Sequence, residues 1–326
     1  MPNIGFNKNL KPAIAAALFF QLLSSYFGTT SAYTISVVTP QLKQAEEYGL
    51  LVHLEPDLHI LGTVHIGARS AEEAQVLIET VQPSNVVIEI PPSRLERIRS
   101  SIRTKNKQKL DSSSGNDMIK SKSNDRPQSR TIVGAMSAYP SLAIAGWSQG
   151  GISGFLFSTL IVWPSLLKRS ITGNEEEEIL PRRNEFEAAI EAADRIGANI
   201  IPVDLEFDEL VQSFVDSMSI LSWMNLARAI FVQSIGLVPV DPVKRQKGES
   251  LVEWETRRRQ VTTSRASRIH GEKLCPELSR MLVDNRDKTF AEACLKAMDN
   301  NVGLGRKTVC IVGLVHVDGI VKGLNS

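Results

Sequence analysis

A seven-residue pattern near each end of the chain constrains its fold more than any other feature. Residues 60–66 and 311–317 both read apolar, apolar, Gly, any residue, Val, His, apolar. Each copy lies in an apolar run typical of a buried strand, so His65 and His316 are each expected just past a strand's carboxyl end. Open α/β sheets bind their ligands at that edge. The pattern therefore predicts that these distant histidines meet in one site.

The order of elements after the first copy of the pattern indicates an α/β fold. Leu50–Leu54 and Leu58–Thr63 read as two strands around a turn, and Ser70 begins a capping-box signature followed by an apolar helical stripe. Pro83 ends that helix, and Val86–Ile90 is apolar enough for a central parallel strand. We therefore expect a mixed or mostly parallel sheet flanked by helices, with long helical insertions.

The second half of the chain carries equally clear boundary signals. Asn184 is placed to cap a helix that Gly197 ends, and Asn199–Val203 reads as a short strand on a sheet edge because it contains a proline. Pro276 begins a long helix that runs toward Met298. Residues 205–238 read as helices, 241–270 as an exposed helix or loop, and 308–312 as the last strand.

The amino terminus resembles a targeting segment. Two lysines precede the apolar run Ala13–Leu23, and small residues at 30–32 offer a cleavage site before Tyr33. Three alternatives stay open: a cleaved secretory signal, the start of a plastid-targeting leader, and an uncleaved anchor. We assign residues 1–32 to this segment and 33–326 to the folded domain, and we expect a location in the secretory pathway or an organelle.

Two internal segments have opposite compositions. Residues 100–130 are polar and almost free of large apolar side chains, which predicts a disordered surface insertion. Residues 131–167 contain no charged residue up to Leu167 and are long enough to span a bilayer, but several glycines and prolines interrupt them. One transmembrane helix and two buried or membrane-surface helices remain alternatives, so membrane association is an expectation.

Charge and cysteine content exclude several classes of function. The formal net charge of +1 argues against nucleic-acid binding through net basicity, and the basic runs Arg94–Lys109 and Arg257–Arg268 read as solvated helix faces or loops. The three cysteines show no CxxC spacing, so neither a disulfide framework nor a zinc knuckle is indicated.

The candidate chemistry lies at the predicted strand ends. His65 and His316 suit metal binding or general-base catalysis, with two structural histidines as the alternative. Glu89 ends an apolar strand, where a carboxylate needs a charged partner, a metal, or an exposed position at the sheet edge. Arg94 either pairs with Glu89, clamps a substrate carboxylate, or lies on the surface at a helix start.

Three further residues extend this candidate set. Asp204 also follows a predicted strand. Arg286 shares a helix face with Phe290, so it is either buried and aimed at carboxylates or exposed in a pairing along its helix. Glu185 falls in the first turn of a helix, where a negative charge favours the helix dipole.

Several of these residues stand in blocks that resemble the TraB/PrgY family, which is related more distantly to the Tiki and GumN-type proteins. The resemblance runs from about residue 48 to the end, with 100–130 as an insertion. The matching blocks are 61–65, 87–89 with Arg94, 185–189, 197–204, 276–287 and 312–320.

The resemblance implies an α/β domain of the erythromycin-esterase/ChaN-like type in which His65, His316 and Glu89 converge. It also implies a divalent transition metal, manganese or cobalt with zinc as a further option, held by these three residues and Glu185. Tiki-type relatives are described as metal-dependent proteases, and the TraB and PrgY members shut down a peptide pheromone by cleavage or sequestration. Other members associate with mitochondrial or related membranes.

Two departures from the family pattern bear on activity. Leu205 stands where the family commonly has Arg, and Asn285 stands where it has Glu. If the missing charges serve catalysis, the chain is a weakened or non-catalytic member; if they pair only with each other, their joint loss is compensated. The leading hypothesis is a metal-dependent hydrolase acting on a peptide bond. The alternative is a non-enzymatic, membrane-associated regulatory or tethering protein that binds a peptide, haem or protein partner.

Overall fold

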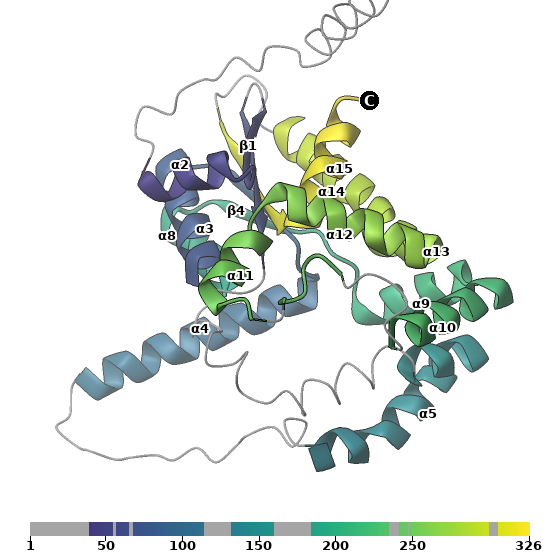
Figure 1. Cartoon of the computed structure of the whole chain (residues 1–326). Coiled ribbons are helices and arrows are strands. Elements are labelled where there is room, and N and C mark those ends of the chain that lie inside the picture. Colours follow the sequence, from purple (N-terminus) through teal and green to yellow (C-terminus); the bar gives the residue numbers. More distant parts are fainter. Residues whose placement is uncertain are drawn as a thin grey trace, which may run out of the picture. The chain divides into compact units, whose positions relative to one another are not determined.

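The described parts of the chain form a five-stranded mixed sheet flanked by helices (Figure 1), in a computed structural model. The expected α/β class with a mostly parallel sheet is confirmed. The structure describes residues 39–54, 57–64, 68–113, 132–159, 184–234, 241–246, 248–299 and 306–326. The predicted targeting segment 1–32 and His65 therefore lie outside the described residues.

The strand order places the last strand of the sequence in the centre of the sheet. The order is β1-β2-β5-β3-β4, with β1 antiparallel to β2 and every other pair parallel. All residues of β2, β3 and β5 are buried, which explains why the sequence shows continuous apolar runs instead of alternation. The strands are β1 (Leu51–Leu54), β2 (Leu58–Thr63), β3 (Asn85–Ile88), β4 (Asn199–Pro202) and β5 (Thr308–Gly313).

Two helix pairs enclose the sheet. The first pair is α3 (Ala68–Val81) and α8 (Glu185–Ile196), and the second is α14 (Asn285–Asp299) and α15 (Leu314–Leu324). Four wholly buried alanines on α8 let α3 approach closely. A short helix, α2 (Pro40–Glu47), packs on α3 and β1.

Local signals fixed the ends of α8 as expected. The Asn184 side chain accepts a hydrogen bond from the Glu187 amide at 2.7 Å, and Gly197 adopts a left-handed conformation with φ of 73°. The start of α3 differs from the expectation, because the helix begins at Ala68 and the Ser70 hydroxyl donates to the Val64 carbonyl instead of capping.

The helix α4 (Pro92–Ser113) extends into the stretch expected to be disordered. Arg99 bonds Asp194 at 2.9 Å, and Lys105 pairs with Glu187, so ion pairs to α8 hold a helix that buries few apolar side chains. The prediction of disorder is wrong as far as Ser113. The rest of the insertion, 114–131, lies outside the described residues.

The uncharged segment forms α5 (Ile132–Phe157), which is broken by non-helical residues at Gly150 and Gly151. The backbones of Gly146 and Gly154, on either side of the break, approach so closely that neither position has room for a Cβ atom. The described part of this segment therefore consists of two helical pieces. Among the residues that the structure describes, no helix is long and apolar enough to cross a bilayer.

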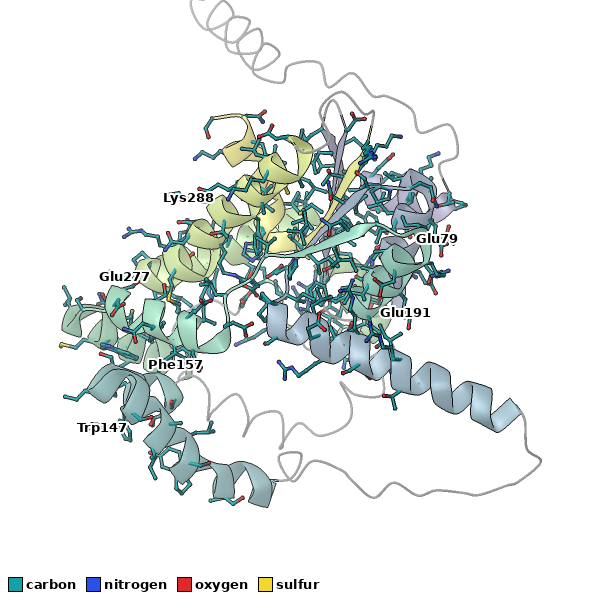
Figure 2. All side chains as sticks on the ribbon, turned by 180° about the vertical axis from the view of Figure 1, so that it is seen from behind. Glu79, Trp147, Phe157, Glu191, Glu277 and Lys288 are labelled. Carbon is teal, nitrogen blue, oxygen red and sulfur yellow. The ribbon has the colours of Figure 1, made fainter. Side chains whose placement is uncertain are left out.

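A small second core lies against the end of α5. The ring of Phe157, labelled in Figure 2, lies 4.6 Å from that of Phe214 on α9 (Phe207–Ser217), and Phe214 lies 5.1 Å from Trp223 on α10 (Ile220–Ser234). These distances are typical of favourable aromatic pairs. Part of the apolar surface of α5 is thus buried against α9 inside the protein.

The helices before β5 are interrupted by a π-helical turn, and they contain a buried arginine. A π-helical turn, η3 (Arg280–Asp284), separates α13 (Pro276–Ser279) from α14, where one long helix was expected. Arg259 lies between α11 (Leu251–Arg258) and α12 (Val261–Leu274), wholly buried and paired with Glu73. The interpretation of Arg257–Arg268 as a solvated basic run is therefore wrong at Arg259.

Candidate active site

The sheet brings three predicted residues to its carboxyl edge. Glu89 directly follows β3, Asp204 follows β4, and His316 lies in the first turn of α15, three residues after β5 ends. Backbone bonds extend the pairing past the strands, since the Glu89 amide donates to Ile311 and the Asp204 amide donates to Ile90. The parallel register therefore fixes the positions of these side chains before any side-chain contact forms.

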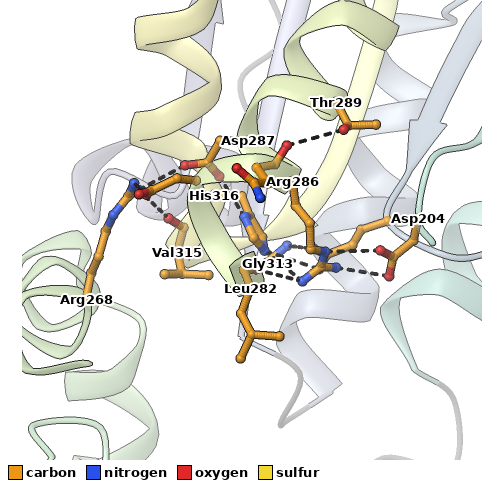
Figure 3. A network of polar contacts seen from close by, with 12 residues as sticks. Asp204, Arg268, Leu282, Arg286, Asp287, Thr289, Gly313, Val315 and His316 are labelled. Carbon is orange, nitrogen blue, oxygen red and sulfur yellow. Dashed lines mark hydrogen bonds and ion pairs between the residues drawn. The ribbon is translucent and has the colours of Figure 1, made fainter. Parts of the chain in front are cut away.

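Arg286, from the first turn of α14, joins these residues (Figure 3). Its Nε and Nη2 donate to the two carboxylate oxygens of Asp204, each at 3.0 Å, in a bidentate pair. Nη2 also pairs with Glu89, and Nη1 donates to the Leu282 carbonyl at 3.2 Å. Arg286 is thus half-buried and aimed at carboxylates, instead of exposed in a pairing along its helix.

His316 is 2 % exposed and has a fixed orientation. Its Nδ1 lies 2.7 Å from Asp287 Oδ1, so Nδ1 carries a proton and donates it to this carboxylate. Its Nε2 accepts from Arg286 Nη1 at 3.3 Å and lies 3.4 Å from Glu89 Oε1. The ring also packs edge-on against Phe290 at 5.1 Å. Nε2 is therefore the atom available for chemistry.

A second arginine holds Asp287 in place. Arg268 Nη1 donates to Asp287 Oδ2 at 3.1 Å, and its Nη2 bonds Asp284. Gly319 on α15 lies so close to the Asp287 carboxylate that a Cβ atom would collide with it. The small residue lets the carboxylate reach His316.

The electrostatics of the network keep Glu89 ionised. Burial raises the pKa of Glu89, but the contacts with His316, the charge of Arg286 and the Gly313 amide bond outweigh it and lower the pKa from 4.5 to about 2. For His316, burial lowers the pKa, but the contacts with Asp287 and Glu89 raise it above 6.5 overall.

The network carries more negative than positive charge. It contains four carboxylates and two guanidinium groups: Glu89, Asp204, Asp284, Asp287, Arg268 and Arg286. Even with His316 protonated, four negative charges face three positive ones. The excess favours a cation, or a substrate group with partial positive charge, near the exposed side of the cluster.

Two predicted residues lie at helix starts beside the sheet edge. Arg94 is exposed in the first turn of α4, with its guanidinium 5.6 Å from the centre of the Phe186 ring, and no ion pair between it and Glu89 is among the described contacts. Glu185 begins α8 and is 4 % exposed. The surface position of Arg94 matches one of its three sequence-based alternatives.

Sequence reasoning missed the roles of Asp287 and Arg268. Arg268 was placed in the solvated basic run, which the structure corrects, because Arg268 bonds two aspartates and is only partly exposed. The sequence holds no signal for this pairing, because Arg268 and Asp287 lie on different helices that meet only in the fold.

A transition metal, as the resemblance implies, would need several of these side chains as ligands. Neither a family model nor a curated protein matches the chain. Within the described ranges, which omit His65, no group of three His, Cys, Asp or Glu side chains is arranged to hold a metal ion. The donor types nevertheless fit, since Asp287 orients His316 in the manner of a carboxylate behind a metal-bound imidazole. Arg286 now occupies the lone pairs of Glu89 and His316 that such an ion would use.

Proposed function

We propose that the chain is a TraB/PrgY-type protein with an erythromycin-esterase/ChaN-like arrangement, acting as a metal-dependent hydrolase on peptide bonds. The observation that carries the proposal is the oriented His316, with Nδ1 on Asp287 and Nε2 beside Glu89. An ionised carboxylate and a fixed imidazole at the carboxyl edge of a parallel sheet suit activation of water.

In this proposal, His65, His316 and Glu89 hold the ion, with Glu185 as the further ligand that the resemblance implies. A bound manganese, cobalt or zinc ion would polarise the scissile carbonyl and lower the pKa of water. The metal role of Glu185 rests on the resemblance alone, and the role of Arg94 rests on the resemblance and on its position five residues after Glu89.

The chain's own side chains supply the remaining steps. Glu89, with its lowered pKa, is a carboxylate at neutral pH, and His316 Nε2 can accept a proton while Asp287 stabilises the imidazolium that results. Arg286 carries guanidinium hydrogens that can turn from Glu89 toward charge developing on the substrate. The network therefore contains a proton acceptor and a cationic donor within one cluster.

At Leu205 and Asn285 the chain differs from the family pattern, and the contacts within this cluster are nevertheless kept. The Leu205 side chain is partly exposed beside Asp204, whose carboxylate keeps its bidentate bond to Arg286. This supports a compensated change, and the activity assay decides between it and a non-catalytic protein.

The test uses the full-length protein and three single variants: His65→Ala, His316→Ala and, as a matched control at the other end of the sheet, His53→Ala. We expect a stoichiometric transition metal by elemental analysis and cleavage of a mixed peptide library by mass spectrometry. Both properties are lost in the first two variants and kept in the control. A metal-free protein whose behaviour is unchanged by the first two variants refutes the proposal.

A second candidate function is favoured by α5. Among the described side chains of this uncharged helix, four apolar ones are more than half exposed: Met136, Ile144, Trp147 (Figure 2) and Ile152. Exposed apolar clusters mark interaction surfaces. They support a membrane-associated regulatory or tethering protein, without catalysis, that binds a peptide, haem or protein partner through the same site.

Vesicle flotation separates the two candidates. The full-length protein is mixed with vesicles of phosphatidylcholine and phosphatidylglycerol, and Ile144→Gln/Trp147→Gln is compared with Ile269→Gln, an exposed apolar residue on α12. Flotation that only the α5 variant loses, in a protein without peptidase activity, supports the second function. Absence of flotation removes its main support.

A further inference from the structure

An open pocket adjoins the network on the far side of the first turn of α15. Its volume is about 510 Å³, including the part open to solvent. The ends of β2 and β5 contribute Thr63, Val64 and residues 313–315, and α11 and α12 contribute Arg258 and two serines. The pocket is thus built from the same two strand ends that carry the repeated histidine pattern.

The pocket lies next to the candidate chemistry. Val64 directly precedes His65, and Val315 directly precedes His316. Arg268 also donates to the Val315 carbonyl, at 3.4 Å, while it holds Asp287. A molecule in this pocket therefore touches the backbone that positions His316.

One wall of the pocket offers positive charge. The guanidinium of Arg258 stacks 4.8 Å from the centre of the Trp254 ring, which fixes its position. The first turn of α15 also borders the pocket, but the amide at its start is engaged, since the Gly313 N–H donates to the Glu89 carboxylate.

Three hydroxyl groups line the pocket, and they differ in whether their hydrogen already has an acceptor in the protein. Thr63 donates to the Val312 carbonyl at 3.2 Å, and Ser267 bonds the Asp241 carboxylate at 2.8 Å, so both hydroxyl hydrogens are engaged. Ser264 lines the pocket next to these residues and can donate to a ligand. Arg258 and Ser264 together suit a carboxylate.

The other wall of the pocket is apolar. Val64, Val243 and Leu314 line it, and the Val243 carbonyl is held by the Trp254 indole at 2.8 Å. A ligand that fills the whole pocket therefore combines a carboxylate with an aliphatic group. The carboxyl-terminal residue of a peptide has this chemistry.

We propose that this pocket binds the carboxyl-terminal residue of a peptide substrate, with the terminal carboxylate on Arg258 and an aliphatic side chain on the valines and Leu314. The inference rests on the proposed peptidase function, since it names the substrate class of that site. The protein then selects peptides with a free carboxyl terminus.

The test measures binding by calorimetry in the presence of EDTA, so that metal-dependent cleavage does not interfere. The probes are acetyl-Ala-Ala-Leu with a free carboxylate, the same tripeptide as a carboxamide, and inorganic phosphate. We expect the full-length protein to bind the acid about tenfold more tightly than the amide. Arg258→Gln loses this preference, whereas Arg265→Gln, at an exposed arginine that pairs with Asp318, retains it.

The outcomes are distinguishable from failure of the proposed function. Equal binding of acid and amide, no binding of either, or phosphate binding as tight as that of the acid each overturns the inference. The comparison of acid with amide in the unmodified protein does not depend on the folding of Arg258→Gln. Missing metal or missing cleavage, with the acid preference intact, overturns the hydrolase and leaves the pocket's specificity standing.

Discussion

The lowered pKa of Glu89 gives a measurable pH dependence of stability. The ordinary value of 4.5 falls to about 2 in the folded protein. Because one pKa unit corresponds to about 1.4 kcal/mol, ionised Glu89 contributes about 3 kcal/mol to the free energy of unfolding. This side chain is 8 % exposed, so solvent screening reduces the figure little.

The direction follows from proton binding. The unfolded chain binds the Glu89 proton at higher pH than the folded protein does, so this contribution is complete above pH 4.5 and is lost as the pH falls toward 2. His316 has the opposite sign. Its folded pKa is raised, so its contribution is complete below pH 6.5 and is lost as the pH rises through the folded value. The network therefore stabilises the fold most between about pH 4.5 and 6.5.

Urea unfolding at a series of pH values tests this reasoning. Between pH 6 and pH 2.5, we expect the free energy of unfolding to fall by about 2.5 kcal/mol less in Glu89→Gln than in the unmodified protein. Glu47→Gln, at an exposed position on α2, serves as the control and should keep the original slope. An unchanged slope in Glu89→Gln would refute the idea that the network holds this carboxylate ionised.

Three further predictions test other contacts. Asp287→Asn should lower peptidase activity by about 10- to 100-fold in a kinetic assay while the fold is kept, because the carboxylate orients the imidazole and stabilises its protonated form. Gly197→Ala should lower the free energy of unfolding by about 1–2 kcal/mol because φ is 73°, whereas Gly271→Ala, within α12, should raise it by about 0.5–1 kcal/mol. Glu73→Gln should cost about 3–5 kcal/mol in urea unfolding by leaving the buried Arg259 charge unpaired, and Glu73→Leu/Arg259→Met should restore most of it.

Each of these has a contradicting result. Full activity in Asp287→Asn removes the orienting role of that carboxylate. Equal effects of alanine at Gly197 and Gly271 show that backbone conformation is not the cause at Gly197. A mild effect of Glu73→Gln indicates that water reaches Arg259.

The sequence was most informative where the backbone alone decides the structure. Buried parallel strands need continuous apolar runs, so β3 and β5 could be read directly. Because parallel strands align their carboxyl ends, the meeting of Glu89 with His316 followed from that reading. The caps at Asn184 and Gly197 could also be predicted from the sequence, since each one forms hydrogen bonds only with backbone groups in the adjacent helix turn.

The contacts that sequence reasoning missed depend on helix packing. Arg268 on α12 and Asp287 on α14 are close only because both helices pack against α15, and no periodicity in the sequence specifies that packing. The helical part of 100–130 depends in the same way on ion pairs to α8. The break at η3 has no turn signal in the sequence either. It ends two residues before Arg286, and π-helical turns are frequent at functional sites.

The central place of β5 has a consequence for biosynthesis. β2 and β3 are never neighbours in the sheet, because β5 lies between them. During synthesis on the ribosome, the edge of β2 and the edge of β3 that later pair with β5 therefore stay unpaired until residues 308–313 have been made. Such edges invite pairing with other chains, so the nascent protein is exposed to aggregation for most of its synthesis and should depend on chaperones.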